Sequence, residues 1–268
     1  MRFAVSALLL AVAVTPAMAG PSKIIGYGDV GAGGQTLSDS NGNWGMPRFA
    51  GDAAVNIPIS ERFNLEFEAW GDTQYGQYYY FGHAAAGTFV HAYARSEAGS
   101  FGAFGGYTNL EFGGYEHGDM FTGGVEGQGY FGNLTLYGQV AGLTSKGREN
   151  DILLTFNGWL ARGTARYFAT PDTRLQFDAQ WMSLSLPTGH GDVLSLVGTA
   201  EHRFAATPFS AFVSGRWDRV SHDPFNFSAA QVTFGARFYF GGNAFENDRS
   251  GATMDTLPMP ALWLRPIT

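Results

Sequence analysis

Residues 63–73 read FNLEFEAWGDT, and their side chains alternate in character along the chain. The odd positions up to Ala69 are apolar, whereas the even positions carry Asn, Glu, Glu, Trp and Asp. Successive side chains of a β-strand point to opposite faces, so this pattern predicts a strand with one apolar and one polar face. In a membrane β-barrel the apolar face contacts lipid and the polar face lines the lumen.

Comparable alternation recurs through the chain, and no segment shows helical periodicity. It is clearest in 55–59, 121–130, 134–141, 209–218 and 231–240. Tight, turn-rich connections at 60–62, 97–99, 132–133, 170–173 and 206–208 separate longer segments at 36–48, 74–80, 109–118, 145–150, 187–191 and 220–228. Short turns on one side and long loops on the other are typical of outer-membrane barrels. We therefore predict an all-β, single antiparallel up-and-down transmembrane barrel of twelve strands, with ten or fourteen as alternatives.

The N-terminus predicts export. Arg2 precedes an apolar stretch over 3–14, and the segment ends in Ala17-Met18-Ala19. A positive start, a short apolar core and a small-residue exit form a secretory signal peptide. A membrane anchor would need roughly 20 apolar residues. We expect residues 1–19 to be a cleavable signal peptide of a Gram-negative bacterium.

Composition supports a barrel embedded in outer-membrane lipid. Glycine accounts for 38 of 268 residues, aromatic residues for 15% and charged residues for only 15%, of which Lys23 and Lys146 are the only lysines. Soluble domains carry roughly 25% charged residues, although a soluble all-β domain stays the alternative. The absence of cysteine excludes disulfides and thiol chemistry. A net charge of −7 argues against a nucleic-acid partner.

The chain is divided into three parts by these patterns. The barrel is expected over 20–240, and 241–268 is expected to be a flexible periplasmic tail, because its alternation stops and glycine and proline are frequent. Within the barrel, the alternation changes parity after Leu160. We expect a β-bulge near Ala161 that keeps Leu160 outside and both Arg162 and Arg166 inside.

Two stretches resemble a known group of proteins. Residues 127–139 (GQGYFGNLTLYGQ) and 235–243 (GARFYFGGN) are similar to a hairpin and a closing strand of porin-like outer-membrane proteins of alphaproteobacteria. The resemblance implies an outer-membrane location. It also implies that Phe238 and Phe240 belong to the barrel-closing strand, with Phe240 as the aromatic residue read by the barrel-insertion machinery.

No motif for catalysis, a metal or another cofactor is present, so no catalytic residue is assigned. The histidines lack metal-ligand spacing. His91 and Ser96 lie near each other in sequence, as barrel-surface lipid hydrolases would require, but chance pairs of this kind are common. Glu66 and Glu68 share a strand face about 7 Å apart, which could serve a glycosidase, although an acidic lumen lining is the simpler interpretation.

Charge is distributed unevenly along the chain. The segment 20–134 has twelve acidic and four basic residues, whereas 135–240 has nine basic and eight acidic residues. The expected pore-lining residues are acidic on one wall and basic on the other: Glu66, Glu68, Glu126, Arg162, Arg166, Arg174, Arg216 and Arg237. Opposed walls would set up a field across a pore. Alternatively, the arginines pair with acids and close a narrow lumen.

Three functions remain open at this point. A porin-type passive channel for small hydrophilic solutes comes first, because twelve strands permit a narrow pore. A non-conducting structural or surface-interaction barrel, with the aromatic segment 75–81 as its contact surface, is the second. An outer-membrane lipid-modifying enzyme is the third, and it would require a Ser–His pair within about 3.2 Å.

Overall fold

The computed structural model describes residues 23–39, 42–75, 83–112, 116–147, 155–187, 189–222 and 225–256. Within them the chain forms twelve strands and one short helix, which confirms the predicted fold class and strand number. The signal peptide and most of the aromatic segment 75–81 lie outside these residues. The elements are β1 (Ile25–Asp39), β2 (Gly42–Pro58), β3 (Phe63–Gln74), β4 (His83–Arg95), β5 (Gly99–Phe112), β6 (Glu116–Phe131), β7 (Leu134–Gly147), β8 (Phe156–Thr170), β9 (Thr173–Leu186), β10 (Gly189–Arg203), β11 (Phe209–His222), β12 (Phe225–Phe240) and α1 (Ala244–Ser250).

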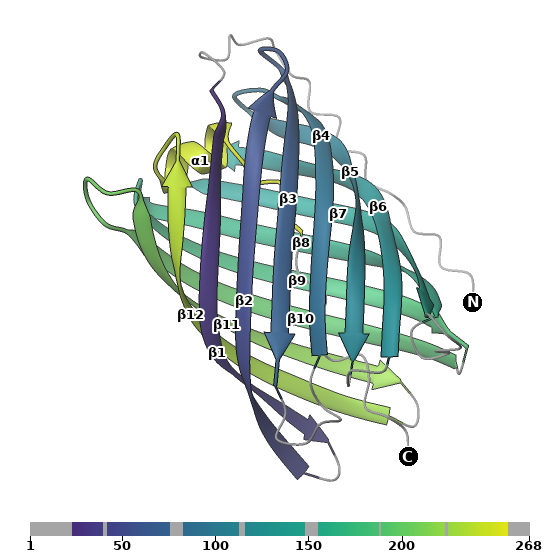
Figure 1. The fold of residues 1–268 in the computed structure, drawn as a ribbon. Helices are drawn as coiled ribbons and strands as arrows, with labels where there is room; N and C mark the ends of the chain where they lie inside the picture. Colours follow the sequence, from purple (N-terminus) through teal and green to yellow (C-terminus); the bar gives the residue numbers. More distant parts are fainter. Residues whose placement is uncertain are drawn as a thin grey trace.

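The strands form one closed antiparallel barrel (Figure 1). Each strand pairs with its neighbours in sequence, and β12 returns to pair with β1. In that last seam Phe240 lies opposite Gly26 and Phe238 opposite Gly28. Closure leaves no unpaired sheet edge, which is what a strand-built membrane protein requires.

The outer wall is apolar. Large side chains such as Val30 (69% exposed), Phe101 (66%) and Phe234 (64%) stand outward on strands all around the barrel. Exposing this many large apolar side chains to water would be unfavourable, whereas a bilayer accommodates them. Among the described residues, no helix is long and apolar enough to cross a membrane.

The inner face has two halves of different chemistry. Apolar side chains gather near the long-loop ends of β3–β9, and this part is called the apolar half. Charged side chains lie nearer the short turns, and a few, such as Arg48, Asp72 and Asp218, extend toward the long loops beside it. The apolar half contains Trp70, Phe89, Phe104, Leu110, Met120, Leu143, Phe156, Leu160, Met182 and Leu184. Inner faces of water-filled barrels are usually polar. A rule that assigns apolar residues to the lipid face therefore places the residues of the apolar half on the wrong side of the wall.

This apolar half explains why the expected bulge near Ala161 is wrong. The pairing of β8 with both neighbours runs unbroken past Ala161, and its one irregularity lies between Phe168 and Thr170. Leu160 points inward with Arg162 and is buried, while Trp159 stands outside and is 49% exposed. A single parity therefore holds along the strand, with both apolar and charged residues on the inner face.

The expectation of a flexible tail is also wrong for residues 241–256. Helix α1 begins directly after β12, at the short-turn end of the barrel (Figure 1), and the segment that follows it is buried. Met254 is 0% exposed and Ala252 is 1% exposed. The barrel itself supplies the partners that order this segment, which is why the composition of the tail alone did not reveal it.

Candidate functional site

The tail is turned into the barrel by its first residues. Gly241 has a φ of +87°, a conformation that side chains other than glycine rarely adopt, and it reverses the chain after β12. Asn243 then caps α1: its side chain accepts from the Glu246 amide, while the Glu246 carboxylate accepts from the Asn243 amide. This reciprocal capping box fixes the start of the helix.

Helix α1 is attached to the short turns of the barrel wall. The Phe245 amide donates to the carbonyl of Pro171, and the ring of Phe245 packs edge-on against Phe168 at 5.1 Å between centroids. Arg249 donates to the carbonyl of Gly132 at 2.8 Å. The helix is therefore tied to two separate turns and covers the short-turn end of the lumen.

Beyond α1, residues 251–256 run through the charged half of the lumen and contact several strands. The Gly251 carbonyl accepts from Arg95 at 2.7 Å and from the Tyr93 hydroxyl at 3.3 Å. Thr253 bonds Gln128 through its carbonyl and hydroxyl, at 2.9 and 3.0 Å. Met254 packs with Tyr93 and Tyr137. These contacts come from β4, β6 and β7, so the segment is held across the lumen rather than along one wall.

The acidic residues of the tail pair with the arginines of β8. Oδ1 of Asp255 lies 2.8 Å from Arg166 and 3.2 Å from Arg162, and Asp248 lies 3.3 Å from Arg166. Asp248 also accepts from the Thr135 hydroxyl at 2.5 Å. Burial alone would raise the pKa of Asp255, but the charges of Arg166 and Arg162 outweigh it and hold that pKa below its usual value. Asp255 is therefore a carboxylate at neutral pH.

The acidic residues of β3 bind the backbone of the same segment. The Glu66 carboxylate accepts from the Thr253 amide at 3.2 Å, and the Glu68 carboxylate accepts from the Thr256 amide at 3.1 Å and its hydroxyl at 2.8 Å. On the same side His91 lies between Glu126 and Glu68, at 2.9 and 3.4 Å. The tail thus presents amides to the acidic wall and carboxylates to the basic wall.

The other predicted arginines also have partners on the wall. Arg174 lies 2.6 Å from Glu201, which lies 3.3 Å from Arg237. Arg237 is 2.6 Å from Asp29, and Arg216 is 2.9 Å from Asp218. All eight residues expected to line the pore are thus on the inner face, and the five arginines are paired with carboxylates of the wall or the tail. Their role in conduction stays a prediction.

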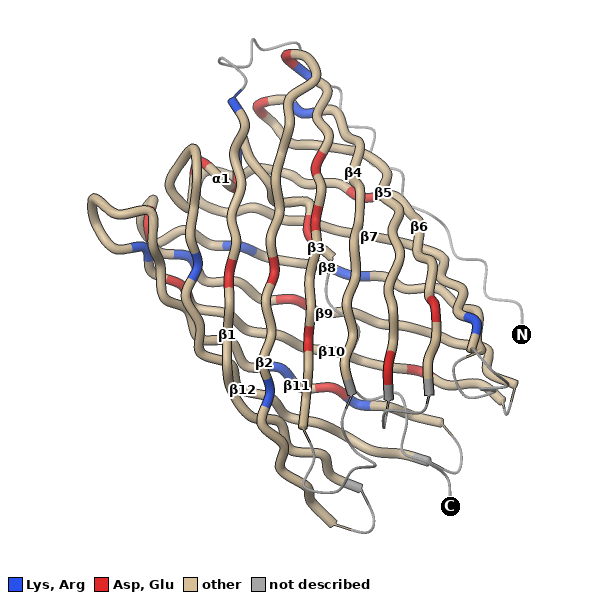
Figure 2. Tube along the Cα trace, in the orientation of Figure 1, with Lys and Arg blue, Asp and Glu red and all other residues tan. Residues whose placement is uncertain are grey.

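The tail carboxylates that pair with Arg162 and Arg166 were missed by the sequence patterns. Asp248 and Asp255 lie in the segment expected to be flexible, although Asn243 and Glu246 have the spacing of a capping box. Figure 2 shows the acidic positions along β3 on the near wall and several basic positions on strands behind them. Alternation predicts that a residue lies on the inner face, but it does not predict which acidic and basic side chains form ion pairs across the lumen.

A charged crevice remains beside the tail. Its volume is about 170 Å³, which leaves room for several water molecules. It is bounded by β1–β3 on one side and β8–β12 on the other, and Asp255 and Thr256 form part of its wall. Its charged lining consists of Asp29, Asp52, Asp72, Asp178, Asp255, Arg48, Arg162, Arg174, Arg216 and Arg237.

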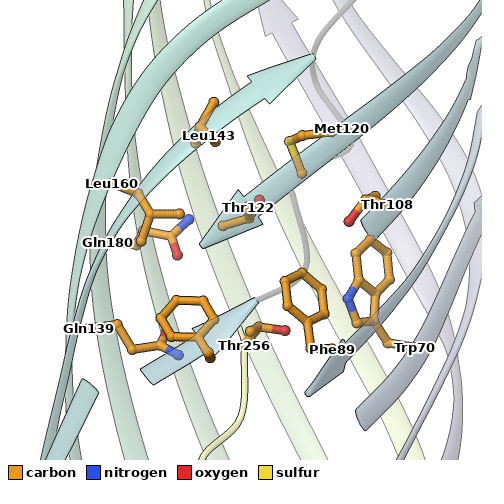
Figure 3. A pocket seen from close by; sticks show the side chains of 11 residues that line it. Trp70, Phe89, Thr108, Met120, Thr122, Gln139, Leu143, Leu160, Gln180 and Thr256 are labelled. Atoms are coloured by element: carbon orange, nitrogen blue, oxygen red, sulfur yellow. The ribbon is translucent and has the colours of Figure 1, made fainter. Parts of the chain in front are cut away.

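The apolar half of the lumen is packed more tightly. Figure 3 shows Trp70, Phe89 and Leu160 around a pocket that Thr256 approaches from the tail. The volume of this pocket is about 20 Å³, enough for about one water molecule. Polar solutes therefore have more room in the charged crevice than through the apolar half.

The possible catalytic groups are arranged differently from the sequence expectation. His91 is buried among carboxylates, while the Ser96 hydroxyl donates to the Gly99 carbonyl in a turn. A different pair, Ser183 Oγ and His190 Nε2, lies 3.0 Å apart on β9 and β10. Asp192 reaches the same Nε2 at 3.6 Å, so it does not orient the ring from the other nitrogen as in a Ser-His-Asp triad. In the described part of the chain, no three or more His, Asp or Glu side chains are grouped to hold a metal ion.

Comparisons with known proteins support the fold. The COG4313 outer-membrane channel from Pseudomonas putida F1 matches with a TM-score of 0.57 and 11% identity, covering 85% of this chain and 100% of that chain. This chain has the fold of an outer-membrane β-barrel. A KdgM porin in complex with disordered oligogalacturonate gives a TM-score of 0.48 at 8% identity, covering 81% and 99%. No protein-family profile and no curated protein sequence matches the chain.

Proposed function

We propose that this chain is an outer-membrane channel that admits small hydrophilic solutes through its charged crevice. The crevice of about 170 Å³ is the observation that carries the proposal, because it is the larger of the two described spaces inside the wall. Guanidinium and carboxylate groups along it can replace the hydration of a polar solute as it passes. An apolar outer wall and a polar inner route are the requirements of such a channel.

Paired charges limit what such a route would conduct. Each arginine that lines the crevice has a carboxylate within hydrogen-bonding distance, and the tail occupies part of the lumen. We therefore expect a small conductance for the full chain, well below that of a wide porin. Single-channel recording of the purified protein in planar bilayers tests the proposal. Discrete conductance steps are expected, and bilayers that stay silent despite verified insertion would refute it.

A second candidate is favoured by the Ser183–His190 pair. Both residues lie near the long-loop end of the outer wall, where an enzyme could reach the lipid surface. A hydroxyl hydrogen-bonded to an imidazole is the minimal arrangement for nucleophilic catalysis. Phospholipid hydrolysis by the purified chain, abolished in Ser183→Ala but retained in Ser185→Ala, would establish this activity. No hydrolysis, or hydrolysis that persists in Ser183→Ala, would refute this candidate.

A further inference from the structure

The Asp255 carboxylate occupies a site that the barrel wall builds by itself. Arg162 and Arg166 are four residues apart on β8, an even spacing that places both guanidinium groups on the inner face. Their side chains are only 1% exposed, and a single oxygen of Asp255 lies within 3.2 Å of both. Arginine side chains present several N–H donors in a planar fork and bind carboxylates with high specificity.

Without the tail, Arg166 has no carboxylate partner among its described contacts. Arg162 has its own wall partner, Asp178, at 2.5 Å. Both carboxylates that pair with Arg166, Asp248 and Asp255, belong to the tail. Among the described contacts, Arg166 makes one hydrogen bond to the wall itself, and its acceptor is the neutral side chain of Gln176. A buried, unpaired guanidinium is unfavourable, so the wall requires an anion when the tail leaves.

Solutes in the crevice can reach this anion site. Arg162 and Asp255 both line the crevice, and the Asp255 side chain is 20% exposed, more than either arginine. The crevice side of the ion pair is therefore its accessible side. A solute carboxylate in the crevice would meet the Arg162 guanidinium first, and the Arg166 guanidinium once Asp255 has left.

We propose that Arg162 and Arg166 form a binding site for carboxylate-bearing solutes, and that a solute carboxylate which replaces Asp255 releases the tail from the lumen. The proposal deepens the channel function, on which it rests for the entry of the solute, by naming a class of solute that opens the route. Asp255 is the charged anchor at the end of the described tail. Its neighbour Thr256 is held by hydrogen bonds to Glu68 alone among the described contacts.

The test uses the absence of cysteine from the chain. In an Ala252→Cys variant the new thiol is the only one, and it replaces a side chain that is 1% exposed. Its reaction with a maleimide therefore measures undocking of the tail. Propionate is the probe, and propionamide, which has nearly the same shape without the charge, is the control. Sodium chloride keeps the ionic strength equal.

Propionate should accelerate labelling in proportion to its concentration, by about tenfold once that concentration reaches about ten times its dissociation constant. Propionamide and chloride should not. Adding Asp255→Asn should give fast labelling without propionate and no further acceleration with it. Adding Asp172→Asn, in a surface pair with Arg203, should leave the propionate response intact.

Equal labelling rates with and without propionate would overturn the proposal, as would equal acceleration by propionamide. If the tail of the Ala252→Cys variant does not dock in the lumen, tail release is measured in the unsubstituted chain instead, as the rate of tryptic cleavage after Arg249. The expected responses to propionate and propionamide are the same. Because both assays report tail release and not current, they separate this proposal from the channel itself. If bilayers show no current but labelling depends on propionate, the channel function is refuted and the anion site is not. If the channel conducts but labelling does not depend on propionate, the anion site is refuted and the channel function is not.

Discussion

Replacing Arg166 by methionine removes the arginine that pairs with Asp248 and Asp255 of the tail. Its side chain is 1% exposed, with Asp255 at 2.8 Å and Asp248 at 3.3 Å. Breaking a buried ion pair by removing one partner costs about 3–5 kcal/mol. Asp255 keeps Arg162 and is 20% exposed, so we expect the lower end, about 3 kcal/mol, lost from tail docking. At 1.4 kcal/mol per factor of ten, the undocked fraction of the tail should rise by about a hundredfold.

Limited trypsin digestion measures that fraction. Arg249 lies in α1 and is bound to the carbonyl of Gly132. Trypsin can therefore cleave after Arg249 only when α1 has separated from the barrel turns. When undocking is fast, the cleavage rate follows the undocked population. The matched control is Arg203→Met, which breaks a more exposed pair with Asp172, worth at most about 1 kcal/mol. Arg166→Met should be cleaved about a hundredfold faster than Arg203→Met, whereas equal rates would refute the ion-pair argument.

Two further predictions concern the helix cap and the crevice. Asn243→Ala removes the side chain that accepts from the Glu246 amide, so α1 should lose about 1 kcal/mol and exchange its first amide hydrogens about fivefold faster by mass spectrometry; unchanged exchange would show that the cap is not needed. The double variant Arg216→Ala/Arg237→Ala removes two positive charges from the crevice, so reversal potentials should show a higher cation-to-anion permeability ratio. An unchanged ratio would mean that ions do not pass these residues.

The strand pattern could be predicted from sequence because lipid and lumen impose opposite chemistry on alternating residues. In β3 every predicted face is observed, from Phe63 outside to Asp72 inside. The turn at 60–62 lies between β2 and β3 as expected. Such local rules fixed the number of strands, since each strand is recognised independently of the others.

The same rules failed where the lumen departs from a polar lining. Leu160 was placed outside because apolar residues usually face lipid, but it is buried with Phe156 in the apolar half of the inner face. For the tail, the loss of alternation and the frequent glycine and proline suggested flexibility. Its stability comes from specific partners on distant strands, such as Glu66 for Thr253 and Arg166 for Asp255. Contacts of this range depend on the closed barrel and are not encoded in any local pattern.

The central claim, a channel whose lumen is controlled by its own tail, is tested most directly by comparing two truncated chains. One ends at Thr256 and keeps every tail contact described above, and the other ends at Gly242 and lacks α1 and the segment that binds Arg162 and Arg166. Single-channel conductance is measured for both in planar bilayers under identical salt. The chain ending at Gly242 should conduct with larger steps and longer openings, because the tail no longer occupies the charged part of its lumen. Equal conductance of the two chains would contradict the account.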